Sequence, residues 1–291
     1  MGRGVRILGV LVLSVGLAAP GIFAEGVDSV RSVMTELQRF LIARRPTADD
    51  QAGTNTLSIE LQPSDQAGPN LYALPRGAAV DFANYLFTVR KAFAETVVFC
   101  RAFAKSAPQD GFPHYRAAVA LEALGRADEA LPEYETSMRA DPAIYTSFRL
   151  WGLYAFHRQD APKAEAEWQR FQHLLLTEEA KVQSFRKTGL TQEAFQLGLY
   201  HLNQTRMFDP AMKEFEMVLK IDPDNEQVQL NLALSRFNKG IQTQREELFD
   251  AALGELRRLS AVAKEPRVQA VAADAVSRSK SIRQQAFGAS R

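Results

Sequence analysis

The sequence contains a single cysteine, Cys100, among 291 residues. One thiol excludes an intramolecular disulfide and any zinc or iron–sulfur site held by several thiolates. The chain also lacks an excess of charge of either sign, with 35 basic and 34 acidic residues. Proteins that bind nucleic acid neutralise phosphates with surplus lysine and arginine, so this balance argues against a nucleic-acid partner.

Signatures of catalysis are also missing from the sequence. It has no Gly-x-Ser-x-Gly, Gly-x-Gly-x-x-Gly, phosphate-binding Gly-Lys-Ser/Thr or His-Glu-x-x-His motif. The four histidines are spread over the chain without the spacing of metal ligands. We therefore predict a protein that is not an enzyme and that has no cofactor and no metal site.

The first 24 residues have the pattern of an export signal. Arg3 and Arg6 precede an apolar run from Ile7 to Ala19, and Ala24 follows where a signal peptidase would cut. We predict cleavage after Ala24, with a cut near Ala19 as the alternative. The competing interpretation is a retained membrane anchor, although the run is shorter than the roughly 20 residues that cross a bilayer. No cysteine follows the run, so the chain is not a lipoprotein, and an exported chain without disulfides suits a bacterial periplasm.

The next part of the chain, 25–110, is predicted to be an N-terminal helical region. Apolar residues at helical spacing predict a short amphipathic helix over 27–41. Proline and glycine are frequent in 45–76, which predicts a long loop, either a mobile linker or a strap that packs through the alternating apolar residues of 57–61. No helix breaker interrupts 77–105, so we expect one long buried helix there.

A spaced pattern recurs in the second half of the chain. An alanine is followed four residues later by an aromatic residue, a proline ends two of the copies, and small residues lie in the helical run upstream of each alanine. The positions that carry the pattern are Gly125, Ala130, Tyr134, Pro142, Gly152, Ala164, Trp168, Gly198, Ala211, Phe215, Pro223, Gly240 and Ala252.

This pattern resembles the tetratricopeptide repeat, a helix–turn–helix unit of about 34 residues. The resemblance implies an all-α fold, an α–α superhelix, with units at about 111–142, 145–176, 191–223 and 226–266 and a capping helix with a basic tail at 267–291. Two departures predict irregular packing. About a dozen extra residues separate the second and third copies, and the turn between Gly240 and Ala252 looks stretched.

In this repeat family the first helix of each unit lines the inner surface, so the resemblance implies contact positions on each first helix. These are Tyr115, Val119, Glu122, Arg149, Leu153, Phe156, Phe195, Leu199, Leu202, Leu230, Leu234 and Phe237. The set is mostly apolar and lacks the lysines with which chaperone-binding members hold a peptide carboxylate. It predicts a groove for an amphipathic helix or a hydrophobic peptide. The alternative is that 57–61 or the helix 77–105 fills the groove from within the chain.

These observations favour an adaptor or scaffold that holds protein partners of the cell envelope in an apolar groove. The second hypothesis is an accessory protein of an envelope transporter that encloses a hydrophobic small ligand or a lipid. The basic tail, with Arg278, Lys280, Arg283 and Arg291, leaves proximity to an anionic membrane open. The sequence indicates neither the identity of the partner nor the oligomeric state.

Overall fold

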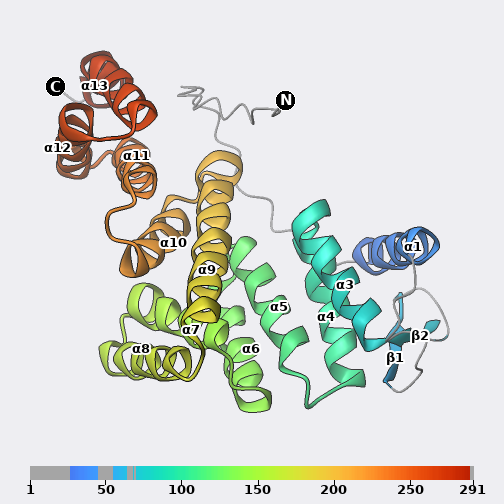
Figure 1. The fold of residues 1–291 in the computed structure, drawn as a ribbon. Helices are drawn as coiled ribbons and strands as arrows, with labels where there is room; N and C mark the ends of the chain where they lie inside the picture. The colour runs from blue at the N-terminus through green and yellow to red at the C-terminus, as the bar shows by residue number, and fades with distance from the viewer. Residues whose placement is uncertain (1–26, 45–54, 64–67, 69, 289–291) are drawn as a thin grey trace, which may run out of the picture. The chain divides into compact units, whose positions relative to one another are not determined.

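The computed structural model describes residues 27–44, 55–63, 68 and 70–288 (Figure 1). The predicted export signal, residues 1–24, lies outside the described residues. The described chain forms two compact units, 27–192 and 193–288, whose boundary falls inside one helix. Each unit is described by itself.

Helices dominate both units. The first unit contains α1 (Val27–Ala43), β1 (Thr56–Leu61), β2 (Asn70–Pro75), α3 (Arg76–Asn84), the π-helical segment η1 (Tyr85–Arg90), α4 (Phe93–Ser106), α5 (Gly111–Ala123), α6 (Ala127–Ala140), α7 (Ile144–Gly152), the π-helical segment η2 (Leu153–Arg158), α8 (Ala161–Leu176) and the start of α9 (Ala180–Tyr200). The second unit contains the end of α9, the π-helical segment η3 (His201–Thr205), α10 (Phe208–Ile221), α11 (Glu226–Gln242), α12 (Glu246–Val262) and α13 (Pro266–Phe287).

Part of the predicted loop 45–76 is a β-hairpin. β1 and β2 pair antiparallel, with Ile59 opposite Tyr72. Leu57, Ile59 and Leu61 are buried in one core cluster with side chains of α1, α3 and α4. The loop prediction is therefore wrong for both strands, because the alternation in β1 turns one face of the hairpin toward a helix layer. The strap interpretation was right that these three side chains pack, and they pack in the N-terminal core.

The segment 77–105 is two helices, so the prediction of one long helix is wrong. η1 ends at Arg90 and is capped by Lys91, which takes the left-handed conformation with φ of 52°. The backbone N–H of Ala92 donates to the carbonyl of Leu86 at 2.9 Å, and α4 begins at Phe93. The chain reverses there without glycine or proline, so α3, η1 and α4 form a helix pair like those that follow.

A left-handed residue follows the first helix of every described pair. A residue with positive φ ends each first helix, and these residues are Lys91, Gly125, Gln159, Arg206 and Gln244. The following N–H donates back to a carbonyl of the last helical turn, in the bonds Ala92 to Leu86, Arg126 to Leu121, Asp160 to Tyr154, Met207 to His201 and Arg245 to Gly240. The bonds of Arg126 and Arg245 span five residues, as in a Schellman cap. The other three span six residues, because each follows a π-helical segment. The described chain therefore contains five helix pairs, the first of them inside the predicted N-terminal region.

The four predicted units correspond to the pairs α5–α6, α7–α8, α9–α10 and α11–α12, and the predicted cap corresponds to α13. The extra residues before the third unit lengthen its first helix, since α9 begins at Ala180. The stretched turn predicted after Gly240 is absent, because α11 continues to Gln242 and α12 begins at Glu246. The chain is a tetratricopeptide-like, all-α repeat protein with one added β-hairpin in its described part.

Two repeat glycines allow close packing of a second helix on a first. A Cβ atom on Gly198 would lie 2.6 Å from the ring of Phe215, the aromatic residue of the third pair. A Cβ atom on Gly240 would lie 2.7 Å from the backbone nitrogen of Phe249 in α12. Ala130, Tyr134 and Ala211 are fully buried between helices, as the repeat pattern predicts.

Candidate binding surfaces

Most of the predicted groove residues lie in the cores of the two units. Eight of the twelve predicted positions are buried, namely Tyr115, Val119, Glu122, Arg149, Leu153, Leu202, Leu230 and Phe237. Tyr115 packs edge-on against Tyr145 with ring centroids 4.6 Å apart, and Phe237 lies 4.4 Å from Phe249. The prediction that these side chains line an open groove is therefore wrong. Their partners within the same unit occupy the space that a ligand would need.

Arg149 shows why a polar residue at a groove position is not available to a partner. Its side chain is 1% exposed, and Nη1 lies 3.3 Å from Oε2 of Glu122. The Tyr134 hydroxyl donates to the same oxygen at 3.4 Å. Breaking such a buried pair leaves an uncompensated charge and costs about 3–5 kcal/mol, so this arginine holds α5 and α7 together.

Four predicted groove residues keep some exposure. Phe156 is half-buried in η2 and packs edge-on against Trp151, with ring centroids 5.6 Å apart. Phe195, Leu199 and Leu234 are half-buried in the other unit, where the first two border a small apolar core and Leu234 borders a second one. They are the part of the predicted groove that a partner is able to reach in this structure.

The most exposed large apolar side chains lie elsewhere. In the described part they are Leu41, Ile42, Leu71, Val89, Leu176, Val182, Phe185 and Val262. Leu176 at the end of α8 is 76% exposed, and Phe185 on α9 is 75% exposed. Leu176 directly precedes the extra residues between the second and third units, and Phe185 lies among them. Their apolar character was visible in the sequence, but the repeat pattern gives no position for them.

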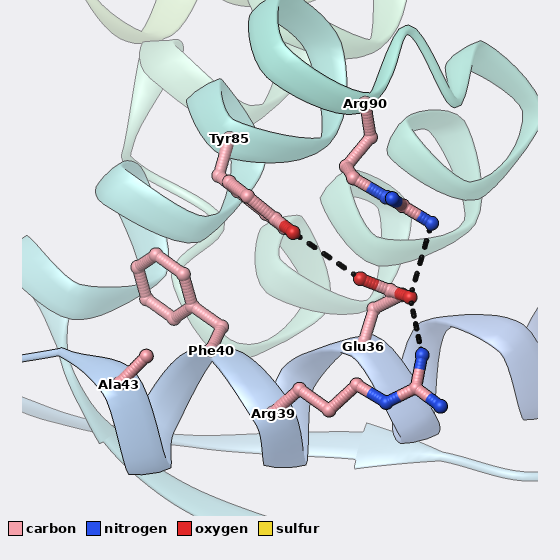
Figure 2. Close-up of a pocket in the computed structure, with 6 residues that line it drawn as sticks. All are labelled: Glu36, Arg39, Phe40, Ala43, Tyr85 and Arg90. Atoms are coloured by element: carbon pink, nitrogen blue, oxygen red, sulfur yellow. Dashed lines mark hydrogen bonds and ion pairs between the residues drawn. The ribbon is translucent and has the colours of Figure 1, made fainter.

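A small open pocket lies between α1 and the α3–η1 segment (Figure 2). Its volume is about 290 Å³, and its lining residues are Glu36, Arg39, Phe40, Ala43, Tyr85 and Arg90. Oε1 of Glu36 lies 3.1 Å from Nη1 of Arg39 and 3.2 Å from Nη2 of Arg90. The Tyr85 hydroxyl donates to the second carboxylate oxygen at 3.3 Å. Sequence reasoning missed this pocket, because its charged residues come from two segments with no shared motif.

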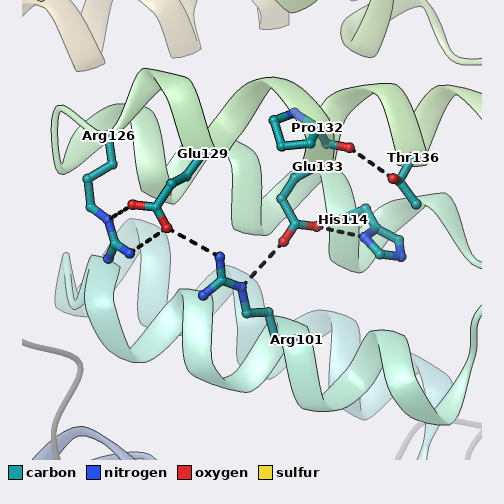
Figure 3. Close-up of polar contacts among 7 residues, drawn as sticks. All are labelled: Arg101, His114, Arg126, Glu129, Pro132, Glu133 and Thr136. Atoms are coloured by element: carbon teal, nitrogen blue, oxygen red, sulfur yellow. Dashed lines mark hydrogen bonds and ion pairs between the residues drawn. The ribbon is translucent and has the colours of Figure 1, made fainter.

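A polar cluster ties α4 to α5 and α6 (Figure 3). Arg101 on α4 reaches Glu133 at 3.3 Å and Glu129 at 3.7 Å. The second oxygen of Glu133 lies 2.7 Å from Nδ1 of His114, and Arg126 holds Glu129 at 2.6 Å. Burial raises the pKa of Glu133, but the hydrogen bonds and charges of His114 and Arg101 outweigh it, so the pKa is below its ordinary value. The cluster joins the first helix pair to the second.

The described residues include neither a metal-binding cluster nor a membrane-length apolar helix. No group of three or more histidine, cysteine, aspartate or glutamate side chains in this part of the chain is placed to hold a metal ion. No described helix combines the length and the apolar character that crossing a membrane requires.

Comparisons with known proteins give structural likeness only. No family model matches the sequence, and no curated protein matches it. Among solved structures, YrrB, described as a TPR protein with an unusual peptide-binding site, is 18% identical, with 68% of this chain and 91% of that chain covered and a TM-score of 0.34. MamA is 15% identical, with 65% and 98% covered and a TM-score of 0.34. PilF of Pseudomonas aeruginosa is 16% identical, with 74% and 93% covered and a TM-score of 0.39.

Proposed function

We propose that this chain is a non-enzymatic scaffold that holds partner proteins on its helical-repeat units in a bacterial cell envelope. The observation that carries the proposal is the succession of five helix pairs in the described chain, in each of which a residue with positive φ ends the first helix. In arrays of this kind each helix pair packs on its neighbours, and the side chains that stay exposed are available to another chain. This architecture favours binding of another chain, and it does not by itself name the partner.

The envelope location rests on the sequence pattern of residues 1–24. A basic start, an apolar run and a small residue at the expected cut support export. The test is the mass of the N-terminal peptide of protein recovered from a periplasmic extract. A chain that begins at Glu25 supports cleavage after Ala24, whereas an intact N-terminus found in the membrane fraction supports the retained anchor.

The partner contact is best sought at the half-buried first-helix residues. Phe156 and Leu199 each retain exposed surface, one in each unit. Phe156 packs against Trp151, and Leu199 borders an apolar cluster. Burial of aromatic and aliphatic side chains of this kind dominates most protein interfaces. Phe237 does not suit this purpose, because it is fully buried and its replacement by a charged residue would unfold the second unit.

The experiment is a pull-down from the native envelope with the full chain carrying a C-terminal tag. Phe156→Ala/Leu199→Ala is compared with Leu176→Ser/Phe185→Ser, after circular dichroism has shown the helical content of each variant. Loss of a partner only in the first variant supports binding through the predicted groove. Loss only in the second variant moves the contact to the α8–α9 connection. A wild-type chain that retains no protein under any condition contradicts the scaffold proposal.

The transporter-accessory hypothesis has no observation in its favour among the described residues. A site that encloses a hydrophobic molecule needs a concave and mostly apolar lining. The lining of the open pocket beside α1 includes two arginines and a glutamate next to its apolar residues, and it does not enclose a ligand. This hypothesis stays a prediction, and extraction of lipid from the purified chain would revive it.

A further inference from the structure

The charged side chains that line the pocket beside α1 carry a net positive charge. One buried carboxylate, that of Glu36, faces two guanidinium groups that approach it from different elements (Figure 2). The charges of these three side chains sum to plus one. The neighbouring Arg44 is paired with Asp81 at 2.9 Å, so Asp81 already has a cationic partner of its own.

Each of the two arginines uses only part of its hydrogen-bond donors on Glu36. In the described part of the chain, Arg39 and Arg90 each reach Glu36 through one nitrogen, and their side chains are 71% and 50% exposed. A guanidinium carries five N–H donors arranged as a fork that matches a carboxylate. The Glu36 side chain is 11% exposed and accepts a bond from both guanidinium groups, so it fixes the position of each.

One wall of the pocket is apolar. Phe40 and Ala43 line it from α1, and the ring of Phe40 lies 5.5 Å from that of Tyr85. The Glu36 carboxylate lies between the two guanidinium groups (Figure 2), so a ligand anion would bond the remaining N–H donors on their exposed sides, with an aromatic surface beside it. The hydroxyl of Tyr85 donates its hydrogen bond to Glu36, so the arginines are the donors available to an incoming anion.

We propose that this pocket binds a carboxylate that is carried next to an apolar group on a peptide. The inference rests on the proposed function, because it names a chemical feature of the protein partner. A singly charged carboxylate balances the local charge of plus one, whereas a phosphate dianion would leave a net charge of minus one beside the buried Glu36. The carboxylate is either the C-terminal group of the partner or an acidic side chain, and the choice of probes distinguishes the two.

The test is a titration of the full chain, labelled with ¹⁵N-arginine, followed through the Nε–Hε resonances of Arg39 and Arg90. N-acetyl-phenylalanine supplies a terminal carboxylate, and N-acetyl-glutamate methylamide supplies a side-chain carboxylate. N-acetyl-phenylalaninamide is the neutral match of the first probe, and inorganic phosphate is the dianion. We expect saturable shifts with one or both carboxylate probes, weaker binding at high salt, and no shift with the amide.

Three variants sharpen the test. Arg39→Gln and Arg90→Gln should each weaken the carboxylate probe roughly tenfold, because each removes a charge-assisted hydrogen bond. Glu36→Gln keeps the shape of the anchor and removes its negative charge, so it should tighten binding, an effect that a purely structural role would not produce. The control is Arg158→Gln, an exposed arginine paired with Asp128 on another helix pair.

Two results would overturn the inference: binding of the amide as tight as that of the acid, or unchanged affinity in Arg39→Gln and Arg90→Gln with helical content intact. The titration uses no partner protein, so its failure is separate from failure of the pull-down. If the pull-down retains a partner but the probes cause no shift, the scaffold proposal stands and the carboxylate site is excluded. If the probes cause shifts but the pull-down retains no partner, the carboxylate site stands and the scaffold proposal is contradicted.

Discussion

The packing of α12 on α11 makes Gly240 hard to replace. A Cβ atom there would meet the backbone of Phe249 at 2.7 Å, and backbone does not move aside as a flexible side chain does. We expect Gly240→Ala to lower the free energy of unfolding by about 1–3 kcal/mol through overpacking. Gly254→Ala in α12 is the matched control, since nothing lies within 4 Å of the added atom. The control should raise stability by about 0.5–1 kcal/mol, and urea unfolding measures both. Equal effects of the two substitutions would contradict this account.

The Glu133 carboxylate should contribute stability that depends on pH. Burial raises its pKa, but His114 and Arg101 outweigh burial, and the folded pKa is below the ordinary 4.5. The contribution of a group with a depressed folded pKa is complete above the unfolded pKa and is lost as the pH falls through the folded one. Glu133→Gln should therefore cost about 1–2 kcal/mol at pH 7, and the difference from wild type should shrink below about pH 4.5.

Unfolding in urea at pH 7 and at pH 3.5 measures the Glu133 effect. Glu129→Gln serves as the control, because this carboxylate is 46% exposed and solvent screens its pair with Arg126. A Glu133→Gln penalty that is as large at pH 3.5 as at pH 7 would exclude the charge as its cause.

Burial of the groove positions could not be predicted from sequence alone. Apolar residues at the inner positions of a first helix fit an open groove and a filled core equally well, because periodicity reports a face and not what covers it. The position of Phe249 opposite Phe237 decides the matter in the second unit, and that contact joins two helices. Arg149 is a similar case, since its partner Glu122 lies on the preceding helix pair.

At the scale of elements, left-handed residues set the ends of the first helices. Gln244 has φ of 53° and is exposed between α11 and α12. An L-residue in this conformation costs about 1–2 kcal/mol that glycine avoids, although glycine also has more freedom in the unfolded chain. We expect Gln244→Gly to raise the free energy of unfolding by about 0.5–1 kcal/mol. Gly125→Ala, with φ of 75° in the native turn, should lower it by a similar amount. A stabilised Gly125→Ala in thermal unfolding would show that the turn is not constrained in this way.

The boundaries of the elements explain which of them the sequence predicted. The predicted first unit begins with α5, where Asp110 accepts a hydrogen bond from the N–H of Phe112, and the predicted cap is α13, which begins at Pro266. The break at Lys91 was missed, because a lysine in the left-handed conformation leaves no compositional mark and the π-helical segment before it continues the apolar face. The hairpin was missed for the opposite reason, since proline and glycine around β1 and β2 resemble a plain loop.

At the scale of the whole molecule, the repeat pattern predicted the order of four helix pairs and the cap. It could not reveal the first pair, α3–η1–α4, in which Thr96 and Cys100 stand three and seven residues after the start of the second helix. Alanine and an aromatic residue occupy those places in α6 and α10, so the fold preserves the geometry of the pair while the sequence signature is lost. Packing of neighbouring helices, more than the identity of the signature residues, maintains the array.

Local packing of this kind predicts that stability is not shared evenly along the chain. Phe249 lies in a core cluster with side chains of α11, α12 and α13, whereas Phe82 lies in one with side chains of α1, β1, α4 and α5. A repeat array opens in sections, because each helix pair depends on its neighbours. Phe249→Leu, at a cost of about 1 kcal/mol, should therefore accelerate amide hydrogen exchange in α11–α13 and leave α1–α4 unchanged. Phe82→Leu should do the opposite, and mass spectrometry of peptides from each region reads both effects. Equal acceleration of both regions by either variant would mean that the described chain unfolds as one cooperative body.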